Sequence, residues 1–343
     1  MIDPESTLMF AEAREAGAVV ARQRAANATL VAGLVERLRA KPPRGVATVA
    51  RGSSDHAATF AKYLIETHLG LPVSSSAPSV SSVYHAAPEL DDTLLIAISQ
   101  SGRSPDLLTA VEAGKASGAL VVAMVNDESS PLAAMADAPL PLRAGPERSV
   151  AATKSYIAAL AAILDLVAAW SGDDALVTAL DAAPALLESA WQCEWPALVD
   201  GLREARGLYV IGRGIGLGVA QEAALKFKET CGLHAEAFSA AEVRHGPMAL
   251  VGPDFPLLVF RQDDQTAEGI DALIAEVGAR GGTVYLAGGD VPGATLLPTP
   301  AAPAVLQPMM QIQAFYRAVN ALSVARGFDP DRPPHLRKVT ETV

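Results

Sequence analysis

A run of small polar residues directly behind an apolar segment holds the side chains best suited to chemistry in this chain. The apolar segment is LLIAI at 94–98, and SQSGRSPD follows it at 99–106. This order predicts a buried strand that ends near Ser99 and a helix that begins at Ser104, with Pro105 in its first turn. Such a corner directs backbone N–H groups and the positive end of a helix at one place. We expect it to bind a phosphate monoester.

The corner also has a plainer interpretation, in which Ser104 is an N-cap residue in an ordinary polar turn. We expect Ser104 to cap the helix in either case. Three serines and a glycine at the carboxyl end of a strand nevertheless favour an anion site. Because hydroxyl groups rather than a lysine surround the predicted anion, we expect a small ligand that is held by hydrogen bonds and released in each cycle.

A second group of candidate residues is the charged stripe of the segment 222–229, EAALKFKE. On a helix, Glu222, Lys226 and Glu229 lie at i, i+4 and i+7 and share one face. The plainer interpretation is a solvent-exposed stripe with ordinary i,i+4 pairing. Because the helix follows a predicted buried strand, we expect the stripe to face a neighbour or a cleft instead. A carboxylate and an amine held there can carry a proton between adjacent carbons.

Two further candidates lie outside regular elements. His245 precedes Gly246-Pro247 in a predicted turn, where a neutral imidazole can act as acid or base near pH 7, although a structural role is more common for a lone histidine. The tail 329–340 contains prolines that exclude a regular helix, and a disordered end is its ordinary interpretation. Apolar residues around Lys338 also allow the tail to lie across a cleft, where the amine would meet a carbonyl by Schiff base or by charge.

The composition narrows the class of protein. The chain has 343 residues, of which 50% are hydrophobic, enough for two α/β domains. Its formal net charge of −11 argues against nucleic acid as a partner. No uninterrupted apolar stretch of about 18 residues occurs, so no membrane span is expected. Two isolated cysteines, Cys193 and Cys231, offer no zinc site and, without a signal-peptide pattern, favour a cytoplasmic location.

A strand–helix order occurs twice along the chain. The predicted strands are 46–50, 94–98, 120–125, 207–211 and 256–260, and a long helix is expected at 151–169. The segments 116–123 and 279–286 align with each other, which makes the repeat explicit. We therefore predict an α/β fold of two tandem, flavodoxin-like domains, each a doubly wound parallel sheet with ligand sites at the carboxyl ends of its strands.

The boundaries that we expect follow from this repeat. They are 1–42 for an N-terminal helical arm, 43–172 for the first domain, 173–204 for linker helices, 205–328 for the second domain and 329–343 for a C-terminal tail. The two copies differ at the corner, because SQSGRS at 99–104 corresponds to RQDDQT at 261–266. Two aspartates would repel a phosphate, so we expect only the first copy to bind the anion. The turn GRGIG at 212–216 does not match a dinucleotide-binding fingerprint.

Taken together, these residues resemble the tandem sugar-isomerase (SIS) family, in particular the isomerase half of glucosamine-6-phosphate synthase. The pieces that carry the resemblance are 99–102, Glu147 with 151–154, 222–229, 234–237, 242–247 and the tail through Lys338. They cover nearly the whole chain in order.

The resemblance implies a role for each candidate residue. The predicted phosphate ligands are Ser54, Ser99, Gln100, Ser101 and Ser104, and further substrate contacts are expected from Gly52, Ser53, Glu147 and Ala152. Glu229 would shuttle a proton between C1 and C2 of the sugar, with Lys226 beside it. His245 would reach in from a second subunit to open the sugar ring, and Lys338 would sit at the carbonyl. The resemblance thus implies a homodimer with a shared site, and it requires no metal or organic cofactor.

Departures from the synthase refine the expected activity. We expect no glutaminase domain here, since the predicted arm stands in its place, and Ala152 replaces a serine of the synthase. The loop RSPD at 103–106 and the tail KVTET at 338–342 look like the stand-alone, second type of glucosamine-6-phosphate deaminase. That enzyme converts glucosamine 6-phosphate and water to fructose 6-phosphate and ammonia. Deglycases of phosphorylated fructosamines, deaminases of galactosamine 6-phosphate and sugar-phosphate sensors of the same family remain alternatives.

Overall fold

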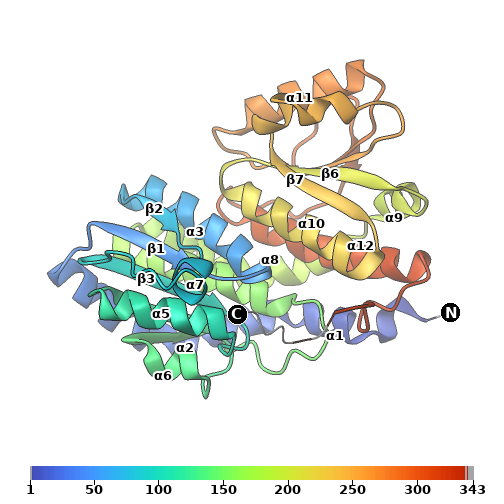
Figure 1. The fold of residues 1–343 in the computed structure, drawn as a ribbon. Helices are drawn as coiled ribbons and strands as arrows, with labels where there is room; N and C mark the ends of the chain where they lie inside the picture. The colour runs from blue at the N-terminus through green and yellow to red at the C-terminus, as the bar shows by residue number, and fades with distance from the viewer. Residues whose placement is uncertain (1, 337, 339–343) are drawn as a thin grey trace. The chain divides into compact units, whose positions relative to one another are not determined.

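The computed structural model describes residues 2–336 and 338, which form two compact units. The first-sheet unit consists of Ala18–Glu147, Lys154–Asp181 and Lys338. The second-sheet unit consists of residues 2–17, Arg148–Thr153 and Ala182–Leu336. Each unit contains one five-stranded parallel sheet with helices packed on it (Figure 1).

The strands of the first sheet are β1 (Gly45–Val49), β2 (Val73–Ser75), β3 (Thr93–Ser99), β4 (Leu120–Val125) and β5 (Ala138–Pro141). Their order is β2-β1-β3-β4-β5, and every neighbouring pair is parallel. Alternate residues of the central strand, such as Leu95 and Ala97, form a core with α5 (Pro105–Ala116). The intervening residues Leu94 and Ile96 are also buried, as expected for a sheet that is covered on both faces.

Further helices of the first-sheet unit include α3 (Ser53–Leu69), α4 (Ser79–Ser82), α6 (Pro131–Met135) and α7 (Lys154–Ser171), and α3 packs along α7. By length and composition α7 is apolar enough to cross a membrane, the one such helix among the described residues. However, 83% of that stretch is buried inside the fold, which is typical of a core helix. The helix predicted at 151–169 therefore exists but begins at Lys154, because residues 151–153 belong to the preceding loop.

The second sheet repeats the first. Its strands are β6 (Gly207–Gly212), β7 (His234–Ser239), β8 (Leu257–Phe260), β9 (Val284–Ala287) and β10 (Thr295–Leu297). Their order, β10-β9-β8-β6-β7, is again second, first, third, fourth and fifth along the chain, and all neighbours are parallel. The predicted tandem α/β fold with doubly wound, flavodoxin-like sheets is therefore confirmed.

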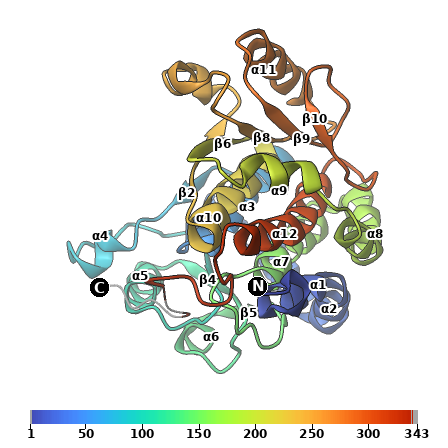
Figure 2. The same ribbon diagram turned by 90° about the vertical axis from the view of Figure 1, so that its right-hand side faces the viewer.

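Helices cover both faces of the second sheet. Figure 2 shows α11 (Ala267–Ala279) on one face and α10 (Leu217–Cys231) with α12 (Gln307–Ala325) on the other. Apolar residues of α11, including Ile270 and Ile274, share a core with Ile211 of β6 and Val259 of β8. Short 3-10 turns lie at Gly214–Gly216, Glu242–Arg244 and Pro247–Leu250. On the opposite face α10 packs along α12.

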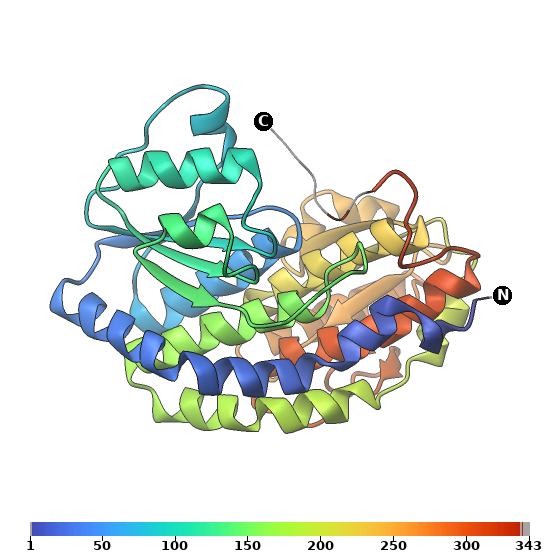
Figure 3. The ribbon, with the colours of Figure 1, turned by 90° about the horizontal axis from the view of Figure 1, so that it is seen from below.

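The remaining helices lie within residues 2–42 and 173–204. The arm consists of the short turn Pro4–Ser6 and two consecutive helices, α1 (Leu8–Arg14) and α2 (Ala16–Ala40), drawn in blue in Figure 3. The linker contains α8 (Asp174–Trp191) and α9 (Pro196–Leu202). In the tail, residues 329–336 form no helix, as the prolines predict.

Candidate functional site

The predicted phosphate corner lies at the switch point of the first sheet. β1 and β3 are neighbours, with Val49 opposite Ala97, while β2 and the pair β4–β5 extend away from them in opposite directions. Loops at such a point open outside the carboxyl ends of the strands, where ligands of doubly wound folds bind. The loop 50–52 behind β1 and the loop 100–104 behind β3 therefore meet at one edge of the sheet.

A glycine and two hydroxyl groups shape the loop behind β3. Ser99 is buried and its Oγ accepts a hydrogen bond from the Gly102 N–H at 2.9 Å, while Ser101 Oγ accepts from the Arg103 N–H at 3.4 Å. Gly102 has a φ of +63°, and a Cβ there would lie 2.3 Å from Ser130 Oγ. Only glycine fits this position, because its backbone conformation and the close approach of Ser130 both exclude a side chain.

The expectation that Ser104 caps the following helix is wrong. Ser104 does occupy the N-cap position of α5, with extended backbone angles, and Pro105 begins the helix as predicted. Its side chain, however, makes no capping hydrogen bond. The Ser104 hydroxyl is therefore not used by the helix, and it stands at the positive end of the helix dipole.

The other predicted phosphate ligands, Gln100, Ser101 and Ser54, occupy the same edge, together with the predicted substrate contacts Gly52 and Ser53. Gln100 and Ser101 are half-buried in the loop behind β3, and Ser53 and Ser54 are half-buried in the first turn of α3. Gly52 precedes them at the N-cap of that helix with a φ of +54°. The structure thus brings the β1 and β3 loops of the prediction together within one unit.

Two ion pairs support this corner, and the sequence interpretation missed both. Asp106 has a fully buried side chain, and its Oδ2 accepts hydrogen bonds from Arg51 Nε at 2.9 Å and Nη2 at 2.6 Å. Arg103 pairs with Asp127 on the exposed side, at 2.8 Å. A hydrogen bond from Ser129 and the Arg103 guanidinium lower the pKa of Asp127. Arg51 thereby brings a half-exposed positive charge to the end of β1.

The charged stripe of α10 is buried, so its interpretation as a solvent-exposed stripe is wrong. Glu222 and Lys226 have fully buried side chains, and that of Glu229 is 22% exposed. The Lys226 ammonium lies 3.3 Å from Glu222 Oε1 and donates a hydrogen bond to Glu229 Oε2. From α12, the Tyr316 hydroxyl donates to Glu222 Oε1 at 3.1 Å. A single ammonium therefore joins a buried carboxylate to one that reaches solvent.

Electrostatics assign different roles to the lysine and the glutamate. Burial alone would lower the pKa of Lys226, but the charges of Glu222 and Glu229 and their hydrogen bonds outweigh it and raise that pKa. Lys226 consequently stays protonated at neutral pH and cannot accept a proton. Of the three residues, Glu229 combines a carboxylate with access to solvent, so it is the candidate general base.

His245 lies on an exposed turn of the second-sheet unit. It follows the 3-10 turn Glu242–Arg244, and the next residue, Gly246, has a φ of +134°. Arg244 pairs with Glu276 at 3.0 Å and so ties the turn to α11. In the described part of the chain, the His245 side chain is hydrogen-bonded or ion-paired to no other side chain. The structure thus does not bring it to the Lys226–Glu229 pair, which leaves its predicted role open.

Glu147 and Lys338 contact each other within the first-sheet unit. The Lys338 ammonium lies 3.6 Å from Glu147 Oε2, whose side chain is fully buried. Glu147 also accepts hydrogen bonds from the Ser155 N–H at 3.1 Å and from Ser155 Oγ at 2.5 Å. Glu147 therefore holds the amine of the tail, a contact that the prediction of a substrate ligand at this residue did not include.

Carboxylates also anchor the loop around Ala152 and the beginning of the tail. Glu12 of the arm accepts hydrogen bonds from the backbone N–H groups of Arg148 at 2.5 Å and Ser149 at 3.1 Å, in the loop that leads to the half-buried Ala152. In the tail, Asp331 accepts from Leu8 N–H at 2.6 Å and from the Met9 N–H at 2.8 Å, at the N-terminus of α1. Asp331 thus bonds the described beginning of the tail to the positive end of α1.

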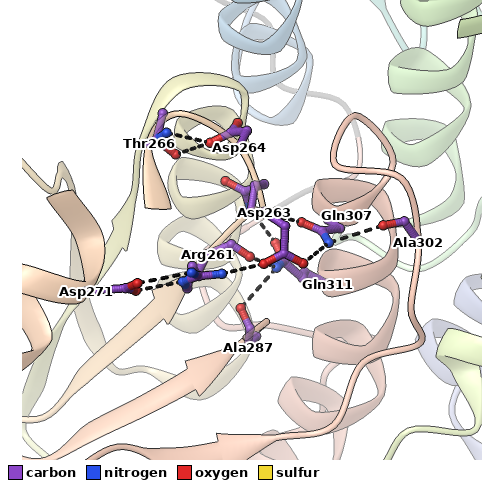
Figure 4. A network of polar contacts seen from close by, with 10 residues as sticks. Arg261, Asp263, Asp264, Thr266, Asp271, Ala287, Ala302, Gln307 and Gln311 are labelled. Atoms are coloured by element: carbon purple, nitrogen blue, oxygen red, sulfur yellow. Dashed lines mark hydrogen bonds and ion pairs between the residues drawn. The ribbon is translucent and has the colours of Figure 1, made fainter. Parts of the chain in front are cut away.

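The second sheet has a different corner at its own switch point, and Figure 4 shows it. Asp264 accepts hydrogen bonds from the Thr266 N–H at 2.7 Å and from Thr266 Oγ1 at 2.6 Å, just before α11. Arg261 pairs with Asp263 at 2.5 Å and with Asp271 at 2.6 Å. The carboxylates of the chain itself therefore pair with the local donors, and the absence of a phosphate site in this copy stays a prediction.

The residues that the sequence interpretation missed are Arg51, Asp106 and Tyr316. An arginine after one strand and an aspartate in the first turn of a helix are a weak signal for the first two, and no signal points to Tyr316. Among residues 2–336 and 338, no three His, Cys, Asp or Glu side chains gather in a way that could hold a metal ion.

Comparison with known proteins places this architecture. A family model for the SIS domain matches residues 42–169 and 201–288. The chain belongs to the SIS family. The matched stretches contain β1–β5 and β6–β9, so the tandem arrangement expected from the resemblance is confirmed.

The chain is also similar to named proteins over most of its length. The chain is 35% identical over 306 residues to a glutamine–fructose-6-phosphate aminotransferase (isomerizing) of Legionella pneumophila, covering 86% of this chain and 50% of that protein. It is therefore homologous to the isomerase domain of that aminotransferase, and it spans about half the length of the curated relatives that it matches.

Solved structures agree with this placement. A crystal structure from Silicibacter pomeroyi DSS-3, provisionally named a phosphosugar isomerase, is 43% identical, with a TM-score of 0.91 and coverage of 95% of this chain and 100% of that one. A glucosamine-6-phosphate deaminase of Thermotoga maritima is 23% identical, with a TM-score of 0.74 and coverage of 94% and 98%. The latter likeness concerns the fold alone.

Proposed function

We propose that this protein is an enzyme that acts on sugar phosphates, and that it converts glucosamine 6-phosphate and water to fructose 6-phosphate and ammonia. The observation that carries the proposal is the division of chemistry between the two copies. One copy keeps a hydroxyl-lined corner at its switch point, and the other buries a lysine that holds a solvent-accessible carboxylate. The homology to the isomerase domain of an aminotransferase that uses fructose 6-phosphate supports the substrate class.

In the proposed reaction, the phosphate binds at the corner and anchors one end of the sugar. Ser99, Gln100, Ser101 and Ser104 supply its hydrogen bonds together with Ser54. Binding energy at this remote group positions the reacting carbons, which contributes several kcal/mol to catalysis. His245, from a second copy of the chain, assists ring opening.

The proton transfer is the work of Glu229. Its carboxylate removes the C2 proton of the open aldose, which gives an enolamine, and returns the proton to C1. The product is an iminium at C2, to which water adds before ammonia leaves. Lys226 holds the Glu229 carboxylate, and Lys338 approaches the carbonyl end of the sugar from the tail. General acid–base transfer of this kind contributes roughly two to four orders of magnitude in rate.

A panel of substrates tests the proposal. The protein is incubated with glucosamine 6-phosphate, galactosamine 6-phosphate, a fructosamine 6-phosphate and fructose 6-phosphate, and both ammonia and ketose phosphate are measured. We expect ammonia and fructose 6-phosphate in equal amounts from glucosamine 6-phosphate. Release from the fructosamine alone would make the protein a deglycase. Aldose formation without ammonia would make it a plain isomerase, and tight binding without turnover would make it a sensor.

Ser104 offers a sharp test of the phosphate corner. Because its hydroxyl makes no capping hydrogen bond, Ser104→Ala should leave the free energy of unfolding within about 0.5 kcal/mol, whereas the loss of a true cap costs about 1 kcal/mol. The loss of one hydrogen bond to a dianion should raise KM about tenfold with little change in kcat. Ser117→Ala, at the opposite end of the same helix, is the control. An unchanged KM would remove Ser104 from the site.

The proposed homodimer has its own test. Glu229→Gln and His245→Ala should each be inactive as pure variants. If His245 crosses to the partner, a mixed dimer contains one site with both native residues, so a statistical mixture should recover about a quarter of the wild-type activity. The mixture is made by unfolding and refolding the two variants together. A mixture that stays inactive, although mixed dimers form, would place His245 in the site of its own chain.

A further inference from the structure

The hydroxyl of Tyr316 lies deep in the core of the second-sheet unit, directly on the charged stripe of α10. The Tyr316 side chain is fully buried, and it donates its hydrogen bond to Glu222 Oε1 at 3.1 Å. The neighbouring Phe315 packs edge-on against Phe227 of α10, with ring centroids 5.1 Å apart. This aromatic contact fixes α12 along α10, so the phenol is presented to Glu222 by a rigid helix pair.

The contact matters because the buried Lys226 is shared between two carboxylates. Glu222 is fully enclosed, and Glu229 is the one that reaches solvent. A buried carboxylate is costly unless hydrogen-bond donors satisfy it. Tyr316 supplies one such donor to the same Glu222 oxygen that Lys226 approaches. Without the phenol, Glu222 would draw the ammonium more strongly towards itself, and Glu229 would lose part of its support.

We infer that Tyr316 is a positioning residue for the proton transfer: through Glu222 it fixes Lys226, and through Lys226 it orients the Glu229 carboxylate. The inference rests on the role of Glu229 in the proposed function. The sequence carries no sign of it, since Tyr316 lies 94 residues from Glu222 and belongs to no motif. We assign no proton transfer to Tyr316 itself, because its hydroxyl donates to Glu222 and the transferred proton belongs to Glu229 in the proposed reaction.

The first test is Tyr316→Phe, which removes the hydroxyl and keeps the ring. We expect kcat to fall about tenfold, the size of one lost hydrogen bond to a charged group, while KM for glucosamine 6-phosphate stays within about twofold. Tyr209→Phe is the matched control. Tyr209 is also buried, on β6, and packs against Phe238 and Phe255, away from the stripe. A merely structural role for Tyr316 would lower the stability of Tyr316→Phe and leave its kcat unchanged.

A double-mutant cycle asks whether Tyr316 acts through Glu222. Glu222→Gln alone should lower kcat more than Tyr316→Phe does, because it removes the negative charge that holds Lys226 and leaves only one of the two acceptor oxygens. If the phenol acts only through that carboxylate, the double variant should be no slower than Glu222→Gln. Multiplied effects would mean that Tyr316 works by another route, and the inference would then be wrong.

A spectroscopic readout keeps the inference testable even if the protein turns out not to catalyse the reaction. With ¹⁵N-labelled lysine, the slowly exchanging ammonium of buried Lys226 should give its own signal near neutral pH, assigned by its loss in Lys226→Met. Tyr316→Phe should shift or broaden that signal, and Tyr209→Phe should leave it unchanged. An unaltered Lys226 signal in Tyr316→Phe would overturn the inference, whereas a shifted signal in an inactive protein would contradict only the proposed function.

Discussion

Glu229→Gln should reduce turnover of glucosamine 6-phosphate by at least about a thousandfold and leave sugar-phosphate binding nearly intact. The amide matches the carboxylate in size, so Lys226 keeps a neighbour, but it cannot accept the C2 proton. Loss of a general base costs roughly two to four orders of magnitude. Binding should persist because the proposed phosphate contacts belong to the first-sheet unit, and Glu229 belongs to α10 of the second.

The measurement pairs steady-state kinetics with calorimetric titration of fructose 6-phosphate. Lys228→Gln is the control, since Lys228 is the exposed neighbour of Glu229 on the same helix and changes charge without touching the buried stripe. Activity within tenfold of the wild type in Glu229→Gln would assign the base to another residue. Loss of binding along with activity would mean that Glu229 contacts the ground state of the substrate rather than the proton alone.

Gly102→Ala adds only one methyl group, and it should nevertheless distort the phosphate corner. The new Cβ would stand 2.3 Å from Ser130 Oγ and 2.8 Å from Val125 Cγ2, in a backbone conformation with a φ of +63°. The loop must therefore move, and with it the N–H groups and hydroxyls around the anion. We expect KM to rise by more than about tenfold and the free energy of unfolding to fall by about 2–4 kcal/mol.

Gly70→Ala separates the two causes of this loss. Gly70 ends α3 with a nearly equal φ of +66°, but a Cβ there would meet nothing within 4 Å. Its substitution should therefore cost only the backbone preference, about 1 kcal/mol, and leave KM unchanged. Chemical denaturation and kinetics of both variants give the comparison. Equal stability losses and an unchanged KM in Gly102→Ala would show that the corner does not depend on this loop conformation.

Several parts of the fold could be predicted because local patterns determine them. The apolar runs that became β3 and β4 are buried on both faces, and such strands stand out as continuous hydrophobic segments. Pro105 marked the beginning of α5 for a similar reason, since proline is accommodated in the first turn of a helix. The three-residue edge strands β2 and β10 went undetected, because so short a segment has no periodicity of its own.

In the candidate site, too, only the features that a local sequence pattern determines could be predicted. Helical spacing placed Glu222, Lys226 and Glu229 on one face, but it could not say that α12 would cover that face. Contacts between residues far apart in sequence, such as Arg51 with Asp106, depend on strand order and not on local pattern. Ser104 shows the converse, since serine is well suited to capping and its side chain nevertheless makes no capping hydrogen bond.

The self-paired corner of the second sheet has a consequence for stoichiometry. A duplicated fold with two equivalent anion sites would bind two substrate molecules per chain. Substrate bound at the second site would not react. In the second corner, Asp264 accepts hydrogen bonds from Thr266, and Asp263 pairs with Arg261. We therefore expect each chain to bind one sugar phosphate, at the corner of the first sheet, because the two aspartates of the second corner would repel a second phosphate.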